Sequence, residues 1–162
     1  MRQTAVYPGS FDPLTRGHLD IIQRACRNFE RVIVAVANNP GKKHTFSVAE
    51  RIQMVEASIR EIPNAEVDTF SGLLVDYLKS RKARILIRGL RAVSDMDYEF
   101  QMAAVNRRLF KEMETVFLMP DEQHTYLSSS IVKEVCQRGA AMDSFVTPPV
   151  ARMLRRRFGL KT

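Results

Sequence analysis

The segment 31–37, RVIVAVA, consists almost entirely of apolar side chains, most of them β-branched. A strand of this composition has both faces buried, as in a parallel sheet that carries helices on each side. The runs at 84–88 and 115–119 have the same character, and segments with helical spacing of apolar residues separate the runs. The sequence therefore predicts an α/β fold: a doubly wound, Rossmann-like, five-stranded parallel sheet with helices on both faces.

The expected elements alternate along the chain. Strands are expected at 3–8, 31–37, 66–70, 84–88 and 115–119, and helices at 19–29, 47–62, 73–80, 94–110, 128–139 and 147–158. Several boundaries carry recognisable signals. Ser47 and Glu50 have the spacing of a capping box, and Thr147 followed by Pro148 is typical of a helix start. Gly159 lies just beyond the expected end of the last helix.

One globular domain accounts for the 162 residues, of which 45% are hydrophobic and 27% charged. We expect a single domain over residues 1–162, with 140–162 as a C-terminal helical extension. No stretch has the features of a signal peptide or the length of a membrane span, so a cytoplasmic protein is expected. Cys26 and Cys136 lie on apolar helix faces, where reduced thiols behave as small hydrophobic groups.

The formal net charge of +7 and the isoelectric point near 9.8 predict an anionic partner. A phosphate-rich small molecule and a nucleic acid both fit this surplus, and the distribution of the cations separates them. The one tight run, Arg155–Arg157 beside Arg152, favours a solvated helix face or a subunit contact. Because the chain has no tryptophan and no basic segment interleaved with aromatic residues, a nucleic acid is not expected as a partner. No membrane partner is expected either, because no apolar run approaches the length of a membrane span.

Residues 7–18, YPGSFDPLTRGH, join the first expected strand to the first expected helix. The first N–H groups of a helix have no partners within the helix and carry partial positive charge, so a phosphate gains hydrogen bonds there. Gly9 and Gly17 remove side chains that would block the approach. With Thr15 as the N-cap, His18 lies in the first helical turn and its ring can address the same anion. The alternative is a tight turn that carries a surface histidine.

Phosphate-binding residue types also follow the other strands, where doubly wound sheets bind their ligands. The loop at 38–43 carries Lys42, although loop lysines are most often merely solvated. Arg88 and Arg91 follow the fourth strand, and guanidinium groups bind phosphate oxygens in a planar, two-pronged fashion. Two surface arginines would be the alternative. After the fifth strand, 124–130 offers three serines at a helix start, which is more than a helix cap requires.

These segments together resemble bacterial phosphopantetheine adenylyltransferases in sequence and spacing. The resemblance rests on YPGSFDPLTRGH, the loop lysine, LIRGLRAVSDMDYE and HTYLSSSIVKEV, and it extends from about residue 3 to residue 138. The motif at 15–18 matches T/HxGH of the wider nucleotidylyltransferase superfamily, and the serines match its second signature. The segment 87–99 is more specific, and it favours pantetheine phosphate over nicotinamide mononucleotide or glycerol phosphate as the acceptor.

The resemblance implies that the adenylyl group of ATP is transferred to 4′-phosphopantetheine, giving dephospho-coenzyme A and pyrophosphate in coenzyme A synthesis. The implied catalytic residues are His18, Lys42, Arg91 and Ser10. The implied ATP-binding residues are Ser10, Phe11, His18, Gly89, Leu90, Arg91, Glu99, His124, Thr125, Tyr126, Leu127, Ser128, Ser129 and Ser130. The implied phosphopantetheine-binding residues are Ser10, Lys42, Leu74 and Arg88. Position 10 is often threonine in the family and position 124 often aromatic, so stacking of His124 on adenine is left open.

The chemistry of this reaction agrees with the residue types. A phosphate monoester is anionic near neutral pH and needs no general base, so direct in-line attack on the α-phosphorus is expected. The protein must supply positive charge, and the helix N–H groups, His18, Lys42, Arg88 and Arg91 are its expected sources. Mg²⁺ is expected with ATP, held mainly by phosphates and water. No metal site made by the protein is expected, because the three histidines lack ligand spacing.

The family resemblance further implies a homohexamer and feedback inhibition by coenzyme A. Three other functions remain open at this point. The nearest is adenylyl or cytidylyl transfer to another phosphorylated acceptor, and the second is non-catalytic binding of nucleic acid. The third is a dinucleotide-dependent oxidoreductase, which is disfavoured because the first strand is not followed by GxGxxG.

Overall fold

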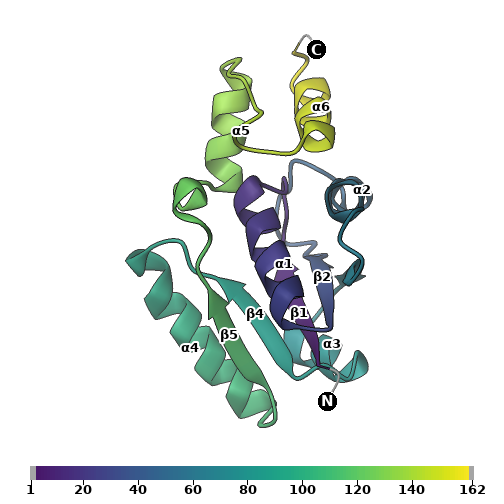
Figure 1. Cartoon of the computed structure of the whole chain (residues 1–162), viewed down its shortest axis with the longest axis vertical. Coiled ribbons are helices and arrows are strands. Elements are labelled where there is room, and N and C mark those ends of the chain that lie inside the picture. The colour runs from purple at the N-terminus through teal and green to yellow at the C-terminus, as the bar shows by residue number, and fades with distance from the viewer. Residues whose placement is uncertain (1–2, 161–162) are drawn as a thin grey trace.

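A five-stranded parallel sheet forms the centre of the computed structural model, which describes residues 3–160 (Figure 1). Its strands are β1 (Thr4–Gly9), β2 (Arg31–Ala37), β3 (Ala65–Phe70), β4 (Ile85–Gly89) and β5 (Glu114–Leu118). They lie in the order β3-β2-β1-β4-β5, and every neighbouring pair is parallel. The expected doubly wound, Rossmann-like sheet is confirmed.

Helices connect the strands and continue beyond the sheet. They are α1 (Arg16–Asn28), α2 (Val48–Ile59), α3 (Leu74–Ser80), α4 (Val93–Leu109), α5 (Ser129–Gln137) and α6 (Pro148–Arg157), with a short 3₁₀ turn, η1 (Glu122–His124). The sequence predicted each of these helices except η1, with small differences at their ends. Within residues 3–160, none of the helices combines the length and apolar character that crossing a bilayer requires.

Alternation along the strands divides the core into two layers. Ala5 and Tyr7 of β1 belong to a cluster that includes apolar residues of α1 and α2, whereas Val6 belongs to a second cluster with α3. Figure 1 shows α1 crossing one face of the sheet, with α5 and α6 at the top of the molecule. Helices therefore cover both faces of the sheet, as the continuous apolar strands predict. Apolar residues of α6 join the first cluster, among them Leu154.

Helix starts follow the expected signals in two of three cases. Ser47 and Glu50 form a complete capping box at α2, each side chain bonded to the other's backbone N–H. Thr15 is the N-cap of α1. Thr147 precedes α6 as expected, but its side chain makes no capping hydrogen bond. Its hydroxyl lies 2.8 Å from that of Ser58 instead, which ties the start of α6 to α2.

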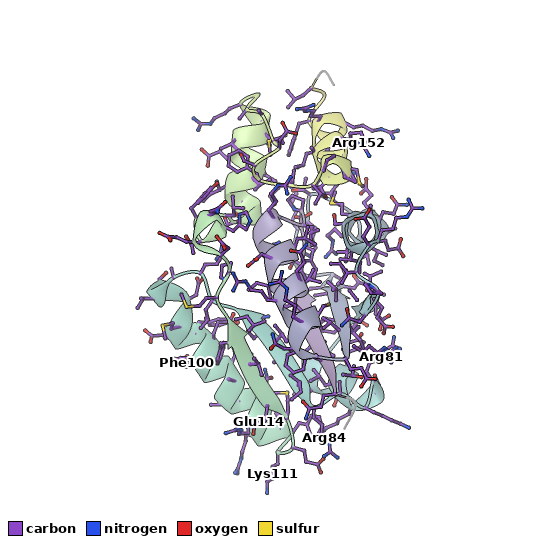
Figure 2. The ribbon with its side chains drawn as sticks, in the orientation of Figure 1. Arg81, Arg84, Phe100, Lys111, Glu114 and Arg152 are labelled. Atoms are coloured by element: carbon purple, nitrogen blue, oxygen red, sulfur yellow. The ribbon has the colours of Figure 1, made fainter. Side chains whose placement is uncertain are left out.

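Cationic side chains are dispersed over the surface. Figure 2 shows Arg84 and Lys111 at one end of the molecule, near Glu114, and Arg152 on α6 at the opposite end. Arg84 is paired with Glu112 at 2.7 Å, and Arg157 is paired with Glu50. The labelled cations thus lie at both ends of the molecule, and Arg84 and Arg157 are each paired with a carboxylate.

The topology places one crevice at the carboxyl ends of β1 and β4. These strands are neighbours in the sheet, but the chain leaves β1 toward α1 on one face and leaves β4 toward α4. Such a reversal of connection direction is the switch point at which doubly wound sheets bind ligands. The segments at the switch point are the turn 10–15 and the residues that follow Gly89.

Two buried charged side chains anchor the segments around this crevice. Arg51 of α2, only 1% exposed, donates to the carbonyls of Ser10 at 2.7 Å, Ala37 at 2.9 Å and Phe46 at 3.2 Å. Asp12 accepts from the backbone N–H groups of Thr45 and Phe46, each at 2.9 Å. The loop between β2 and α2 is thereby held against the turn after β1.

Replacing Arg51 with methionine tests this anchor. The variant removes donors from three carbonyls and leaves Asp12 without a nearby guanidinium, so we expect the free energy of unfolding to fall by about 3 kcal/mol or more. Chemical denaturation measures the loss. The matched control is Arg60→Met at the exposed end of the same helix, for which stability should change little. Equal losses in the two variants would contradict the anchoring role.

Candidate active site

His18 is held at the start of α1 by reciprocal hydrogen bonds with Thr15. The Thr15 backbone N–H donates to Nδ1 of the His18 ring at 3.0 Å, and the Thr15 hydroxyl accepts from the His18 backbone N–H at 3.3 Å. This is a capping box in which histidine occupies the place usually taken by glutamate. The His18 ring also packs edge-on against the ring of Phe11, with 5.2 Å between the two ring centroids.

The same bonds decide the protonation of the ring. Because Nδ1 accepts the Thr15 N–H, a neutral His18 carries its proton on Nε2. Burial, aided by the positive charge of Arg91, lowers the pKa of His18 to about 4. In this structure the His18 ring is therefore neutral near pH 7. At neutral pH the ring supplies an N–H donor, and the charge must come from other residues.

A cavity of about 70 Å³ brings His18 and Arg91 together at the switch point. The structure brings together in its lining five of the residues predicted to bind ATP: His18, Gly89, Arg91, His124 and Leu127. Arg91 is oriented by bonds to the carbonyl of Leu127 at 3.1 Å and to the carboxylate of Asp95 at 3.3 Å. The guanidinium thus joins the segment after β4 to the segment before α5.

Glycines at this site serve the protein's own packing. A Cβ at Gly9 would lie 2.9 Å from the ring of Phe11, and a Cβ at Gly17 would lie 3.4 Å from the carbonyl of His124. The space beside Gly9 is therefore filled by Phe11 and is not open to a ligand, contrary to the sequence-based expectation. At Gly17 the missing side chain lets the η1 segment come close to the start of α1.

A second cavity, of about 180 Å³, has Arg88 in its lining, whereas the next residue, Gly89, lines the first. Arg88, Glu99 and Leu74 line it together with Tyr98 and Met102, among others. Arg88 forms a two-pronged ion pair with Glu99, with Nε at 2.7 Å and Nη2 at 2.5 Å from the carboxylate oxygens. The structure thus places Glu99 on Arg88 in this second cavity, rather than among the residues that line the His18 cavity.

The loop at 38–47 between β2 and α2, called the lysine loop here, exposes its two ammonium groups to solvent. Lys42 and Lys43 are exposed, whereas His44, the next residue, is largely buried with Nδ1 3.8 Å from Asp12. Burial and the positive charge of Arg51 lower the pKa of His44. The loop therefore offers charge at its tip while its carboxyl-terminal end is fixed to the turn that carries Ser10.

The three serines at 128–130 differ in their hydrogen-bond partners. Ser128 caps α5 by accepting from the backbone N–H of Ile131 at 3.2 Å, and Ser129 donates to the carbonyl of Pro13 at 2.8 Å. Ser130 is exposed. Two of the three serines therefore have structural partners, one of which attaches α5 to the turn after β1.

Leu90, Thr125 and Tyr126 line neither cavity, whereas His124 lines the first. Leu90 is buried and its N–H donates to the carbonyl of Leu118 at 3.0 Å. Thr125 bonds to the carbonyl of Glu122 at 2.9 Å, and Tyr126 is exposed, with its ring edge-on to Phe145. His124 has a buried Nδ1 with no hydrogen-bond partner among the residues that the structure describes. Nothing in the structure assigns a stacking role to its ring.

Sequence reasoning missed the charged residues beneath the site. Asp12 is bonded to Lys133 of α5 at 3.3 Å in addition to the lysine loop. Burial would raise the pKa of Asp12, but the two backbone N–H bonds and Lys133 outweigh it and lower the pKa. One signal was available, because Arg51 falls three residues after Val48, within the apolar stripe of α2. A charged residue at a stripe position points to buried hydrogen-bond acceptors.

The low pKa of His18 predicts a pH-dependent contribution to stability. The unfolded chain binds a proton at this residue below about pH 6.5, while the folded chain resists protonation down to about pH 4. The free energy of unfolding should therefore fall between these values as the pH drops, by about 1 kcal/mol per pH unit from this group. His18→Gln retains an acceptor for the Thr15 N–H and cannot ionise. Denaturation of both proteins from pH 7 to pH 4 should give a smaller slope for the variant, and parallel curves would contradict the assignment.

Comparisons with known proteins agree with this geometry. Residues 6–135 match the family model described as cytidylyltransferase-like. A phosphopantetheine adenylyltransferase from Dictyoglomus thermophilum is 53% identical over 157 residues, covering 97% of this chain and 96% of the relative. One from Alkalilimnicola ehrlichii is 51% identical over 160 residues, covering 98% of this chain and 92% of the relative.

Solved structures share the fold at low sequence identity. A bifunctional NMN adenylyltransferase/ADP ribose pyrophosphatase from Francisella tularensis has a TM-score of 0.73 at 16% identity, covering 99% of this chain and 51% of that chain. The family match and the close relatives, taken with the cavity that joins His18 to Arg91, lead to one conclusion. The chain belongs to the phosphopantetheine adenylyltransferases, which are nucleotidyltransferases of the cytidylyltransferase-like family.

Proposed function

We propose that this protein transfers the adenylyl group of ATP to 4′-phosphopantetheine, with dephospho-coenzyme A and pyrophosphate as products. The names of its relatives support this reaction. The structural observation that supports it is a pair of cavities whose linings include consecutive residues at the carboxyl end of β4. Arg88 and Gly89, adjacent in the chain, line different cavities, so two reactants bound there would meet at the end of β4.

The cavity of Arg88 suits the acceptor. Its guanidinium keeps Nη1 available beside the bonds to Glu99, with only a long contact of 3.4 Å to the carbonyl of Pro8. A guanidinium whose orientation is already fixed by a carboxylate can bind a phosphate without losing further side-chain freedom. Leu74 and Met102 on the same cavity give apolar surface for the pantetheine arm.

The cavity of His18 suits the nucleotide. Nε2 of His18 offers an N–H donor at the positive end of α1, and Arg91 offers positive charge. We assign His18 to the phosphates of ATP, where its N–H stabilises charge that develops during transfer. Lys42, exposed on its loop, would close over the reacting phosphates from the side of Ser10.

The reaction then needs no proton transfer to begin. An oxygen of the acceptor phosphate attacks the α-phosphorus of ATP, a new P–O bond forms, and the bond from that phosphorus to the bridging oxygen of pyrophosphate breaks. The neutral ring of His18 donates a hydrogen bond throughout and is not consumed. Arg88, Arg91 and Lys42 bring the two anions together, which accounts for most of the catalytic task.

Mg²⁺ would enter as the complex of ATP, neutralising phosphate charge. Within residues 3–160 no three His, Cys, Asp or Glu side chains are grouped to hold a metal ion. Mg²⁺ prefers to be held mainly by phosphate and water. The absence of a metal site made by the protein remains a prediction.

Assembly, regulation and location are proposed from the family resemblance: a cytoplasmic homohexamer that coenzyme A inhibits. The assembly is supported by α4, whose surface exposes Val93 at 81%, Tyr98 at 64% and Val105 at 51%. Figure 2 shows Phe100 on the same helix, and it is 47% exposed. So many exposed apolar side chains on one helix are typical of a surface that another subunit covers.

Pyrophosphate release tests the proposed reaction. The protein is incubated with ATP and Mg²⁺, with and without 4′-phosphopantetheine, and in parallel with nicotinamide mononucleotide and glycerol phosphate. Release should require 4′-phosphopantetheine, and release with another acceptor alone would overturn its assignment.

His18→Ala should lower kcat by a factor on the order of 10² to 10³, with less effect on ATP affinity. A kcat equal to that of the wild type would remove His18 from the mechanism.

Arg88→Ala tests the acceptor site. The KM for 4′-phosphopantetheine should rise by about tenfold or more, because a hydrogen-bonded charge pair to phosphate is lost, while the KM for ATP changes less. The matched control is Arg84→Ala, which removes an exposed arginine at the other end of β4 that is paired with Glu112. Both constants should then stay at wild-type values. A rise in the KM for ATP alone in Arg88→Ala would refute the assignment.

A further inference from the structure

Tyr7 lies on the central strand and faces the cavity of His18 and Arg91. The residue is 6% exposed and is one of the residues that line this cavity. Its ring packs edge-on against Phe11, with 5.5 Å between the centroids. Its hydroxyl lies against Gly89, where an added Cβ would meet the Tyr7 oxygen at 3.5 Å. The polar end of Tyr7 is therefore at the cavity wall, beside the segment after β4.

This hydroxyl has no hydrogen-bond partner among residues 3–160 of the structure, in contrast to the buried Tyr77. Tyr77 donates to the carboxylate of Asp68 at 2.5 Å. Within residues 3–160, the fully enclosed side-chain atoms without a partner belong to His44 and His124, so the Tyr7 oxygen retains surface from which it can donate to a bound molecule. A hydroxyl at a cavity wall that lacks a partner within the described residues indicates that a bound molecule provides one.

The charges around Tyr7 favour its role as a donor. Burial raises the pKa of Tyr7, although the positive charges of Arg88 and Arg91 act against it. The oxygen therefore keeps its proton at neutral pH and can donate to an anion. Because both guanidinium groups act on it, Tyr7 lies where negative charge is attracted.

We propose that the Tyr7 hydroxyl donates a hydrogen bond to a phosphate oxygen of the nucleotide in the His18 cavity. The nucleotide is the ligand in question because Tyr7 lines the cavity of His18 and Arg91. The cavity of Leu74, assigned to the acceptor, is lined by other residues. Tyr7 is then a catalytic residue in addition to those that the sequence predicted. This inference rests on the proposed function, because it requires a nucleoside triphosphate in that cavity.

Tyr7→Phe removes the hydroxyl and leaves the packing of the ring in place. A hydrogen bond from a neutral donor to a charged oxygen predicts a loss of kcat/KM for ATP on the order of 10- to 100-fold. The KM for 4′-phosphopantetheine should stay at the wild-type value. ATP binding without the acceptor, measured by isothermal titration calorimetry, should weaken in the variant. The melting temperature should be equal to that of the wild type or higher, since no internal hydrogen bond is lost.

Tyr77→Phe is the matched control, because it removes a hydroxyl that has a partner within the protein and lines neither cavity. It should lower the melting temperature and leave the kinetic constants unchanged. Wild-type ATP affinity and kcat/KM in Tyr7→Phe would overturn the proposal, and so would a drop in its melting temperature comparable to that of Tyr77→Phe. If the wild-type protein binds ATP but releases no pyrophosphate with any acceptor, the proposed function fails while the binding comparison still tests Tyr7. If it binds no ATP, both proposals are overturned.

Discussion

The hydrogen bond from the Thr15 backbone to Nδ1 of His18 determines what the centre of the site can do. It forces the proton of a neutral ring onto Nε2 and fixes the ring relative to the first turn of α1. Because burial and Arg91 keep this ring neutral, its contribution is a directed donor. Positive charge then comes from arginine and lysine, whose long side chains must be positioned by other means.

Carboxylates provide that positioning for both arginines. Glu99 holds Arg88 through two hydrogen bonds, and Asp95 holds Arg91 together with the carbonyl of Leu127. A guanidinium oriented before the ligand arrives loses less side-chain entropy on binding. Each carboxylate also partly neutralises the charge of its arginine. The two guanidinium groups near the end of β4 therefore repel each other less than unpaired charges would. The cavities are therefore ordered before either reactant enters.

Periodicity and strand composition were sufficient for the fold, because the buried strands and capping signals such as Ser47 with Glu50 act locally. The same holds for the convergence of His18 and Arg91, since parallel strands bring their carboxyl ends to one edge. Contacts between distant segments could not be predicted. Arg51 bonds to three carbonyls from three different segments, and Glu99 pairs with Arg88 across the start of α4. Neither contact leaves a periodic signature in the sequence.

The lysine loop is tied down at both of its ends. At the start, the Asn38 backbone N–H donates to the carbonyl of Phe70 at 2.8 Å, and at the end Asp12 holds the N–H groups of Thr45 and Phe46. Among the described residues of the loop, 39–43, with Lys42 among them, make no such bond to the sheet or the turn. Admission of a bulky phosphorylated molecule can thus be accommodated by a local adjustment of a few residues, while the rigid framework that aligns the reacting atoms stays undisturbed.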